Sequence, residues 1–130
     1  MSMEAQGVGW KMAALTDIPP VHPDWPATWK SVRHHLGISG FGINGVSKST
    51  GETLIPDHDE TASGQQEVIF VHEGEALVTV EGEQHRAPAG TIIGIEPGVR
   101  RKVEAAASPT TLVIVGGAPG KAYEVADWEK

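Results

Sequence analysis

The sequence predicts an all-β protein, an antiparallel sandwich or barrel, from three observations. The 130 residues include 16 Gly and 9 Pro, so turns must be frequent. Between these turn residues, runs rich in β-branched and apolar side chains recur about every eight to twelve residues. Only scattered stretches could support helical periodicity, so strands are expected to dominate.

The expected strands lie in ten short runs. They are residues 30–38, 40–46, 53–55, 67–74, 75–82, 84–88, 91–95, 99–105, 110–117 and 122–125. Alternation is clearest in the fourth run, where Glu67 and Ile69 share one face while Val68 and His72 share the other. The run 111–115 is apolar on both faces, which predicts a strand covered by the barrel interior on one side and by a second layer or subunit on the other.

Turn residues set the expected connections. Residues 73–75 read as a turn between two strands, and Glu81-Gly82 reads as a tight hairpin turn, so two hairpins in series are predicted. The GFGING segment at residues 40–45 matches the dinucleotide-binding fingerprint letter by letter. No helical period follows it, so we interpret these glycines as a strand that bends or that another backbone approaches closely.

The chain reads as one domain with short extensions, because no shift in composition divides it. We expect an N-terminal arm over residues 1–28, a barrel over 29–126 and a C-terminal tail over 127–130. Prolines keep the arm out of helices and central strands. They lie at positions 19, 20, 23 and 26, and the apolar anchors of the arm are expected to be Trp10, Trp25 and Trp29.

Composition excludes several classes of function. The chain has no Cys, so disulfides, thiolate nucleophiles and Cys-ligated metal sites are ruled out. A net charge of −7 disfavours nucleic acid as a partner. The sequence has no 18-residue apolar run and no basic-then-apolar leader, which predicts a cytoplasmic protein without a membrane partner.

Two motifs carry a family resemblance. The first consists of Gly51, His58, Glu60, Glu67 and Gly74, and the second of Gly90, Glu96, Pro97, Gly98 and Arg101. Together they resemble the paired motifs of the cupin superfamily, and the pieces around them are similar to small single-domain cupins of the cupin 2 type. The resemblance implies a cupin jelly-roll antiparallel β-barrel with an N-terminal Pro-rich arm, a ligand pocket inside the barrel, and a homodimer that pairs through strand edges and N-terminal segments.

The superfamily contains dioxygenases, sugar isomerases and epimerases, decarboxylases, storage proteins and ligand-binding domains of regulators, and the fold does not choose among them. Whether this chain is an enzyme therefore stays open. It departs from the pattern in two places: the interval between Glu60 and Glu67 is longer than the family spacing, and Arg101 stands where the family has its last metal-binding His.

The candidate metal ligands are His58, Glu60 and Glu67. His58 and Glu60 are separated by one position, so on an extended strand they point to the same side, and Glu67 begins a following strand. One imidazole and two carboxylates suit Mn²⁺, Fe²⁺, Ni²⁺ or Zn²⁺ with positions left open for a substrate. This predicts a divalent-metal-dependent enzyme of the dioxygenase, isomerase or decarboxylase type as one alternative.

The leading alternative is a pocket that binds a small polar or anionic molecule through Arg101, His58 and Glu67. A guanidinium cannot ligate a cation, but it can pair with buried carboxylates or hold a ligand carboxylate or phosphate. Arg100 and Arg101 are adjacent, so only one of them faces inward. A third alternative is a scaffold or interaction domain whose pocket is filled with side chains.

The remaining histidines are expected to be structural or exposed. These are His22, His34, His35, His72 and His85.

Overall fold

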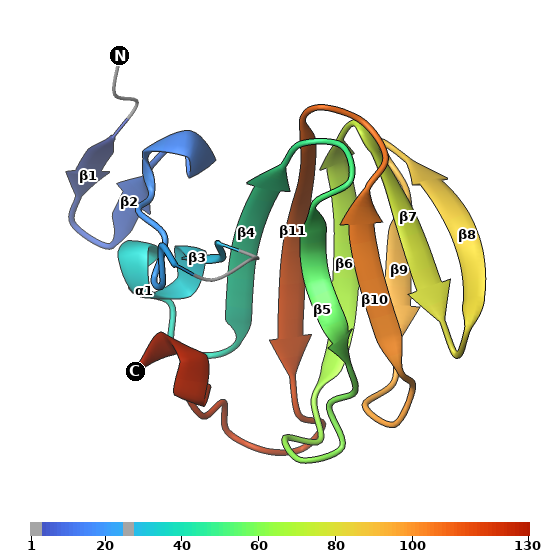
Figure 1. The fold of residues 1–130 in the computed structure, drawn as a ribbon. Coiled ribbons are helices and arrows are strands. Elements are labelled where there is room, and N and C mark those ends of the chain that lie inside the picture. The colour runs from blue at the N-terminus through green and yellow to red at the C-terminus, as the bar shows by residue number, and fades with distance from the viewer. Residues whose placement is uncertain (1–3, 25–27) are drawn as a thin grey trace.

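A computed structural model of the chain describes residues 4–24 and 28–130 (Figure 1). Trp25, one of the expected anchors, lies outside the described residues. The strands are β1 (Ala5–Gly7), β2 (Trp10–Met12), β3 (Lys30–Ser31), β4 (Gly42–Lys48), β5 (Thr53–His58), β6 (Gln66–Glu73), β7 (Glu75–Val80), β8 (Glu83–Pro88), β9 (Ile92–Ile95), β10 (Arg101–Ala105) and β11 (Thr110–Gly117). The helices are α1 (Val32–Leu36) and the 3-10 turns η1 (Leu15–Asp17) and η2 (Asp127–Glu129).

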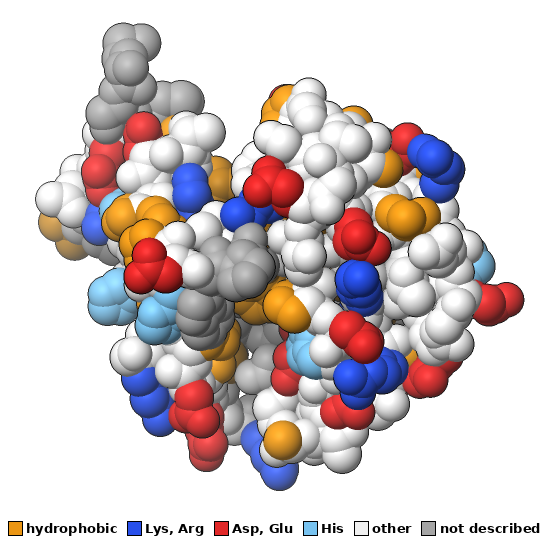
Figure 2. Space-filling view, viewed as in Figure 1, with side chains coloured by type: hydrophobic (Ala, Val, Ile, Leu, Met, Phe, Trp, Pro, Cys, Tyr) orange, Lys and Arg blue, Asp and Glu red, His pale blue; other side chains and the backbone are white. Residues whose placement is uncertain are grey.

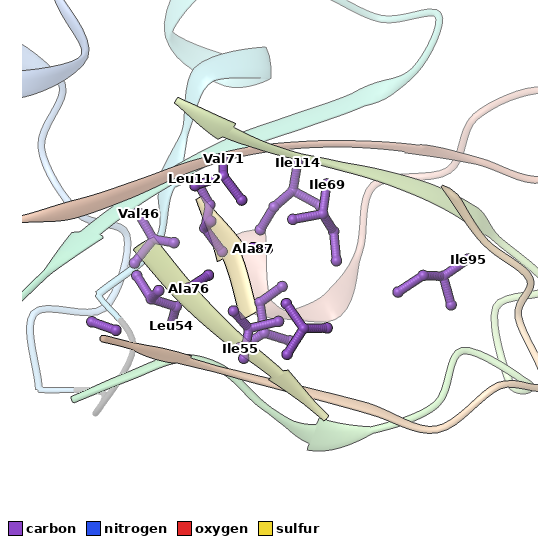
Figure 3. Packing of buried hydrophobic residues seen from close by; sticks show 13 residues of the cluster. Val46, Leu54, Ile55, Ile69, Val71, Ala76, Ala87, Ile95, Leu112 and Ile114 are labelled. Atoms are coloured by element: carbon purple, nitrogen blue, oxygen red, sulfur yellow. The ribbon is translucent and has the colours of Figure 1, made fainter. Parts of the chain in front are cut away.

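Two antiparallel sheets pack face to face, as the all-β prediction requires. One has the strand order β5-β10-β7-β8 and the other β3-β4-β11-β6-β9, while β1 and β2 form a separate hairpin. The core lies between the two sheets (Figure 3). It is built from Val46, Leu54, Ile55, Ile69, Val71, Ala76, Val78, Ala87, Ile95, Val103, Ala105, Leu112 and Ile114.

Strand β11 is central in the five-stranded sheet and pairs with β4 and β6. Its inward side chains Leu112 and Ile114 are fully or almost fully buried, and its outward Val113 and Val115 are half-buried. The two-faced apolar pattern of this run therefore does correspond to a central strand.

The connections differ in part from those predicted. Glu81-Gly82 is a hairpin turn between the paired strands β7 and β8, and both residues have positive φ, which confirms the prediction. The turn at Gly74 is different, because β6 and β7 belong to different sheets. The predicted series of two hairpins is therefore wrong: Gly74, with φ of 80°, carries the chain from one sheet to the other.

Two of the ten expected strands are also wrong as predicted. Residues 32–36 form α1, where the Ser31 side chain accepts a hydrogen bond from His34 N at 3.1 Å and Gly37 ends the helix in the left-handed conformation. These two cap residues are visible in the sequence, and they override the β-like composition of the run. Residues 122–125 form no strand and instead run along the mouth of the barrel towards η2.

Two of the three glycines of the 40–45 segment, Gly42 and Gly45, lie where other side chains come close, whereas Gly40 has open space around it. A Cβ at Gly42 would lie 2.9 Å from the hydroxyl of Tyr123, and a Cβ at Gly45 would occupy the space taken by Leu15. Residues 42–45 belong to strand β4, which confirms that the segment is no dinucleotide-binding loop, but the close approach is made by side chains rather than by backbone. No helix in the described part of the chain is long and apolar enough to cross a membrane.

Candidate functional site

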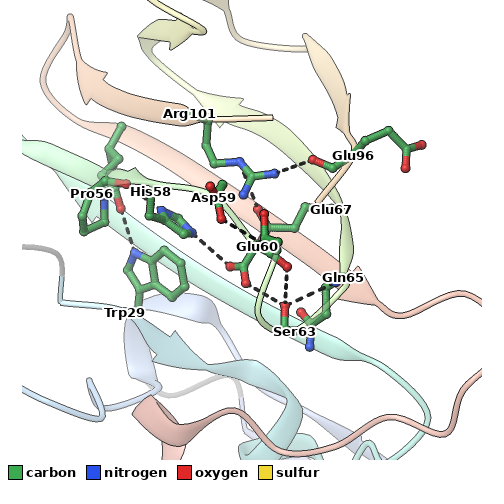
Figure 4. A network of polar contacts seen from close by, with 12 residues as sticks. Trp29, Pro56, His58, Asp59, Glu60, Ser63, Gln65, Glu67, Glu96 and Arg101 are labelled. Carbon is green, nitrogen blue, oxygen red and sulfur yellow. Dashed lines mark hydrogen bonds and ion pairs between the residues drawn. The ribbon is translucent and has the colours of Figure 1, made fainter. Parts of the chain in front are cut away.

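Three candidate ligands meet at one end of the barrel (Figure 4). His58 is the last residue of β5, Glu60 lies in the loop that follows, and Glu67 is the second residue of β6. One ligand atom from each of the three lies within 4.8 Å of the others. Glu60 is not on a strand, so the strand argument holds only for His58, yet the three side chains still converge.

The loop that carries Glu60 is held on both sides. Glu60 N donates to Pro97 O at 2.8 Å, and Glu60 O accepts from Gly64 N at 2.8 Å. The Ser63 hydroxyl donates to Glu60 Oε2 at 2.8 Å. The segment between Glu60 and Glu67, which is longer than in the family pattern, therefore folds as a compact turn. This turn orients the carboxylate of Glu60 towards that of Glu67.

The orientation of His58 is set by the backbone. Its Nδ1 lies 2.7 Å from the carbonyl oxygen of Pro56, which can only accept, so Nδ1 carries a hydrogen. Its Nε2 lies 3.0 Å from Glu60 Oε1. The nitrogen that faces the carboxylates is therefore the one that holds either a second proton or a metal ion, an arrangement common for metal-binding histidines.

The cluster shifts the ionisation of its members. The hydrogen bond to Glu60 raises the pKa of His58 above its usual value, against the effect of burial. Burial raises the pKa of Glu67, and the nearby charge of Glu60 raises it further. For Glu60, burial also acts upward, but hydrogen bonds from His58 and Ser63 outweigh it and lower the pKa.

Arg101 lies behind this cluster. Its side chain is 0% exposed, and its Nε is 3.9 Å from Glu67 Oε1. The only hydrogen bond of the guanidinium to any of the described residues goes from Nη2 to the backbone oxygen of Glu96, at 3.1 Å. Arg100 points outward and pairs with Asp57 at 3.0 Å, which confirms that only one of the two arginines faces inward.

A pocket of about 270 Å³ opens above the carboxylates. Its lining comprises Trp29, Gly42, Asn44, Pro56, His58, Glu60, Ser63, Gln65, Glu67, Ile114, Gly116, Tyr123, Ala126 and Trp128. Arg101 is not part of the lining. Asn44 Oδ1 and Glu67 Oε1 are buried and have no hydrogen-bond partner within residues 4–24 and 28–130, so both present unused acceptors beside the pocket.

The aromatic wall of the pocket comes from both ends of the chain. Trp29 and Trp128 pack edge to face with ring centroids 5.3 Å apart, and Trp29 Nε1 donates to Leu54 O at 2.7 Å. The C-terminal segment is fastened to α1, because Arg33 donates through Nε and Nη2 to Glu129 Oε2, at 2.9 and 2.7 Å. This pair is nearly buried, with side-chain exposures of 12% and 2%.

The sequence motifs predict the polar floor of the pocket, which consists of His58, Glu60 and Glu67, but they miss part of its walls. Asn44, Tyr123 and Trp128 are not among the predicted site residues. A usable signal was the aromatic content: Tyr123 and Trp128 fall in the last eight residues of a chain with only 4 Trp, 1 Tyr and 2 Phe. Of the other histidines, His34, His72 and His85 are exposed.

His22 and His35 have partners away from the pocket. His22 Nε2 lies 2.6 Å from the backbone oxygen of Trp128, and His35 Nε2 lies 2.9 Å from Glu4 Oε1. Neither lines the pocket above the carboxylates.

Comparisons with known proteins agree with this architecture. A cupin protein from Bacteroides fragilis superposes with a TM-score of 0.64 at 16% identity, over 84% of this chain and 92% of that one. A predicted oxalate decarboxylase from Thermotoga maritima gives 0.66 at 12% identity, over 81% and 96%. A sugar phosphate isomerase of the cupin superfamily from Silicibacter pomeroyi gives 0.63 at 20% identity, over 79% and 73%.

At these identities the structural matches establish the fold and nothing finer. No curated protein matches the chain in sequence. The model of the cupin domain family matches residues 50–116, which is just over half of the chain and includes both motifs. This chain belongs to the cupin family.

Proposed function

We propose that this cupin binds a small polar or anionic molecule in the barrel pocket, and that His58, Glu60 and Glu67 hold a divalent cation at its floor. One observation carries the proposal: three ligand atoms converge within 4.8 Å at the bottom of a pocket of about 270 Å³. Pockets that bind small molecules are apolar-walled and carry a few convergent polar groups, as this one does. A scaffold domain with a filled barrel would need no such space.

The donor set fits a divalent metal ion. Nδ1 of His58 carries a hydrogen, which it donates to the carbonyl oxygen of Pro56. In the neutral imidazole the lone pair is therefore on Nε2, the nitrogen that faces the carboxylates. One imidazole nitrogen and two carboxylates suit Mn²⁺, Fe²⁺, Ni²⁺ and Zn²⁺ and leave coordination positions open. Bound there, such an ion would supply Lewis-acid polarisation of a ligand oxygen.

Charge explains why the ligand is expected to be polar or anionic. The carboxylates of Glu60 and Glu67 and the guanidinium of Arg101 leave one net negative charge when His58 is neutral. A divalent cation turns this into one net positive charge, which an anionic ligand would balance. Arg101 is buried behind Glu67, so we expect it to act on the ligand through this balance rather than by direct contact.

A second candidate is catalysis at the same floor. The superposable proteins include one described as a predicted oxalate decarboxylase and one described as a sugar phosphate isomerase. Both descriptions concern small anionic substrates, which agrees with the charge balance above. For this chain, they define the substrates to be tried first.

The test is metal analysis and calorimetry on wild type, His58→Ala, Glu67→Gln and His85→Ala. His85 is an exposed histidine on β8, away from the floor, and so gives a matched control. We expect wild type and His85→Ala to take up about one equivalent of Mn²⁺ or another of the four ions, and both floor variants to lose it. Uptake that survives His58→Ala and Glu67→Gln would overturn the metal assignment.

The ligand is tested next, with oxalate and glucose 6-phosphate added to the metal-loaded protein. A rise in melting temperature with either probe, lost in Glu67→Gln, supports the binding function. Release of carbon dioxide or conversion of the sugar phosphate would establish catalysis. A metal-loaded protein that responds to neither carboxylates nor phosphates would contradict the anionic ligand.

A further inference from the structure

Asn44 is a polar residue at an inward-facing position of β4. Its cross-strand partner on β11 is Ile114, and the partner of Ile114 on β6 is Ile69. Both isoleucines belong to the core, as does Val46, two residues further along β4. Side chains two positions apart share a face of a sheet, so alternation predicts an apolar residue at position 44. An amide here is a departure that core packing does not require.

The amide of Asn44 has an unused acceptor beside the pocket. Its Oδ1 is buried and has no hydrogen-bond partner in the described part of the chain, and the residue belongs to the pocket lining. A rotation about χ2 exchanges the oxygen and the nitrogen of the amide, so either atom can face a ligand. A buried acceptor without a partner costs free energy, which a ligand that pairs with the amide would recover.

Two glycines in the next row bring more polar groups onto the same face of the sheet. Gly42 is paired with Gly116, one row nearer the mouth of the pocket than Asn44. A Cβ at Gly42 would lie 2.9 Å from the hydroxyl of Tyr123, and a Cβ at Gly116 would lie 3.0 Å from Gln65 Oε1. These two polar side chains therefore approach the sheet closely only because both positions are glycine. Polar groups thus lie over two adjacent rows.

Glu67 and Asn44 lie at opposite corners of this polar surface. Glu67 is the partner of Gly116 on β6, so it is two strands and two residues away from Asn44. Strands about 4.8 Å apart and a rise of about 3.4 Å per residue place the two Cα atoms about 12 Å apart. Both side chains reach into this gap, and a ligand with a chain of a few carbon atoms can contact both of them.

The pocket contains no side chain with a permanent positive charge. Its lining, which consists of described residues, includes no Lys or Arg, and Arg101 is buried behind Glu67. On the outside of the barrel, by contrast, acidic and basic side chains are interspersed over β5, β10 and β7 (Figure 2). With a divalent cation at the floor, one negative charge on the ligand completes the charge balance. Nothing in the lining compensates a second one, such as that of a phosphate ester at neutral pH.

We propose that the ligand of this pocket is a hydroxy-monocarboxylic acid, and that Asn44 selects it by a hydrogen bond to its hydroxyl group. This inference rests on the proposed function, since the carboxylate of the ligand is expected at the floor. A hydroxyl both donates and accepts, so it pairs with the amide in either orientation. An ammonium group only donates, and it would also cancel the negative charge of the ligand. The rings of Trp29 and Trp128 offer the carbon chain an apolar surface.

The hydrogen bond to Asn44 should give specificity as well as affinity. An acid without the hydroxyl displaces water from the pocket and leaves the amide unpaired, whereas the hydroxy acid pairs with it. We expect the dissociation constants of two such acids to differ by about tenfold or more.

The experiment is calorimetry of the full Mn²⁺-loaded chain with five acids: butyrate, both enantiomers of 3-hydroxybutyrate, 4-hydroxybutyrate and 4-aminobutyrate. They share one carbon skeleton and differ in a single group. 2-Hydroxy acids are left out, because a hydroxyl next to the carboxylate can chelate the ion by itself. Asn44→Leu and the smaller Asn44→Ala remove the amide, and Gln84→Leu on the exposed part of β8 is the matched control.

We expect wild type and Gln84→Leu to bind at least one hydroxybutyrate about tenfold or more tightly than butyrate. Asn44→Leu and Asn44→Ala should bind the hydroxy acid and butyrate with the same affinity. Their uptake of Mn²⁺ and their affinity for butyrate should match those of wild type, which shows that fold and floor are intact and that only the hydroxyl contact is lost.

The failure of this inference differs from the failure of the proposed function. A wild type that binds butyrate as tightly as every hydroxybutyrate, or a gain from the hydroxyl that survives both substitutions of Asn44, overturns the inference while metal and acid binding remain. Tightest binding of 4-aminobutyrate overturns the hydroxy-acid class. A wild type that takes up no metal, or that binds none of the five acids, overturns the proposed function and this inference with it.

Discussion

Arg101 Nε lies 3.9 Å from Glu67 Oε1, and both atoms are buried without a hydrogen-bond partner among the described residues. The two groups attract each other as charges, but the geometry leaves the donor and the acceptor unused. The sequence motifs align Arg101 with the last metal-binding His of the family pattern, and we interpret its buried guanidinium as a counter-charge to Glu67. The consequence is a floor with two carboxylates and one histidine that exchanges its proton, and one permanent cation buried behind it.

Removing this counter-charge should destabilise the protein. We expect Arg101→Met to lower the free energy of unfolding at pH 7 by about 3 kcal/mol, because it leaves Glu67 buried beside Glu60 without compensation. The double variant Arg101→Met/Glu67→Gln should recover most of the loss, since it removes the uncompensated charge too. Urea unfolding of both single variants and the double variant measures the coupling, and additive losses would contradict an interaction between the two residues.

The affinity for a metal ion should depend on pH, and this dependence should extend above the ordinary pKa of histidine. The pKa of His58 is raised by its hydrogen bond to Glu60, so the proton on Nε2 competes with a metal ion at pH values above 6.5. The folded group keeps its proton until the pH passes this raised pKa, so affinity falls as pH drops through it, by up to about tenfold per pH unit. Calorimetry with Mn²⁺ at pH 6, 6.5, 7 and 8, in two buffers of different ionisation enthalpy, follows both affinity and proton release. An affinity that has already stopped rising by pH 6.5, the ordinary pKa of histidine, would contradict the raised pKa.

Gly74 and Gly82 allow a matched test of the sheet crossing. Their φ angles are 80° and 82°, so alanine meets the same backbone preference at both. A Cβ at Gly82 has no neighbour within 4 Å, whereas one at Gly74 would meet the backbone of Pro109 and would lie 2.8 Å from Thr110 Cα. We expect Gly82→Ala to cost about 1 kcal/mol and Gly74→Ala about 1–3 kcal/mol more, measured by urea unfolding. Equal losses of unfolding free energy in the two variants would mean that the backbone around Gly74 can shift to accommodate the added Cβ.

The sequence is sufficient to predict the fold because its signals are local and repeated. Alternation along residues 67–71 predicts that Glu67 and Ile69 share one face and Val68 the other, and in the protein the first two are buried while Val68 is exposed. Composition fails at 32–36, where two residues, Ser31 and Gly37, determine a short helix within a β-like run. Capping is a property of single positions, so the composition of the whole run does not reveal it.

The candidate site could be predicted only where one motif supplies several of its groups. His58, Glu60 and Glu67 lie within ten residues, and their convergence follows from two adjacent elements. Asn44 and Trp128 reach the same pocket from distant parts of the chain. The aromatic content of the last eight residues is a weak signal for Trp128, but no motif near Asn44 indicates its role. Long-range contacts of this kind depend on how β4 and the C-terminal segment pack, which sequence spacing does not encode.

The C-terminal wall of the pocket should depend on one buried ion pair. Glu129 accepts two hydrogen bonds from Arg33 and is 2% exposed, whereas the side chain of Asp127, two residues earlier, is 100% exposed. Glu129→Ala leaves the guanidinium of Arg33 without its carboxylate, and we expect the free energy of unfolding to fall by about 3 kcal/mol. Asp127→Ala removes the same charge at the surface and should change it by less than about 0.5 kcal/mol.

Limited proteolysis separates local release from global loss of stability. Lys121 is exposed and precedes the segment that carries Tyr123 and Trp128, so trypsin can detach that segment where the chain opens. Under native conditions we expect Glu129→Ala to be cleaved after Lys121 faster than wild type or Asp127→Ala, with the barrel remaining intact by mass spectrometry. Cleavage at the wild-type rate would show that the edge-to-face packing of Trp128 on Trp29, rather than the ion pair with Arg33, holds the wall in place.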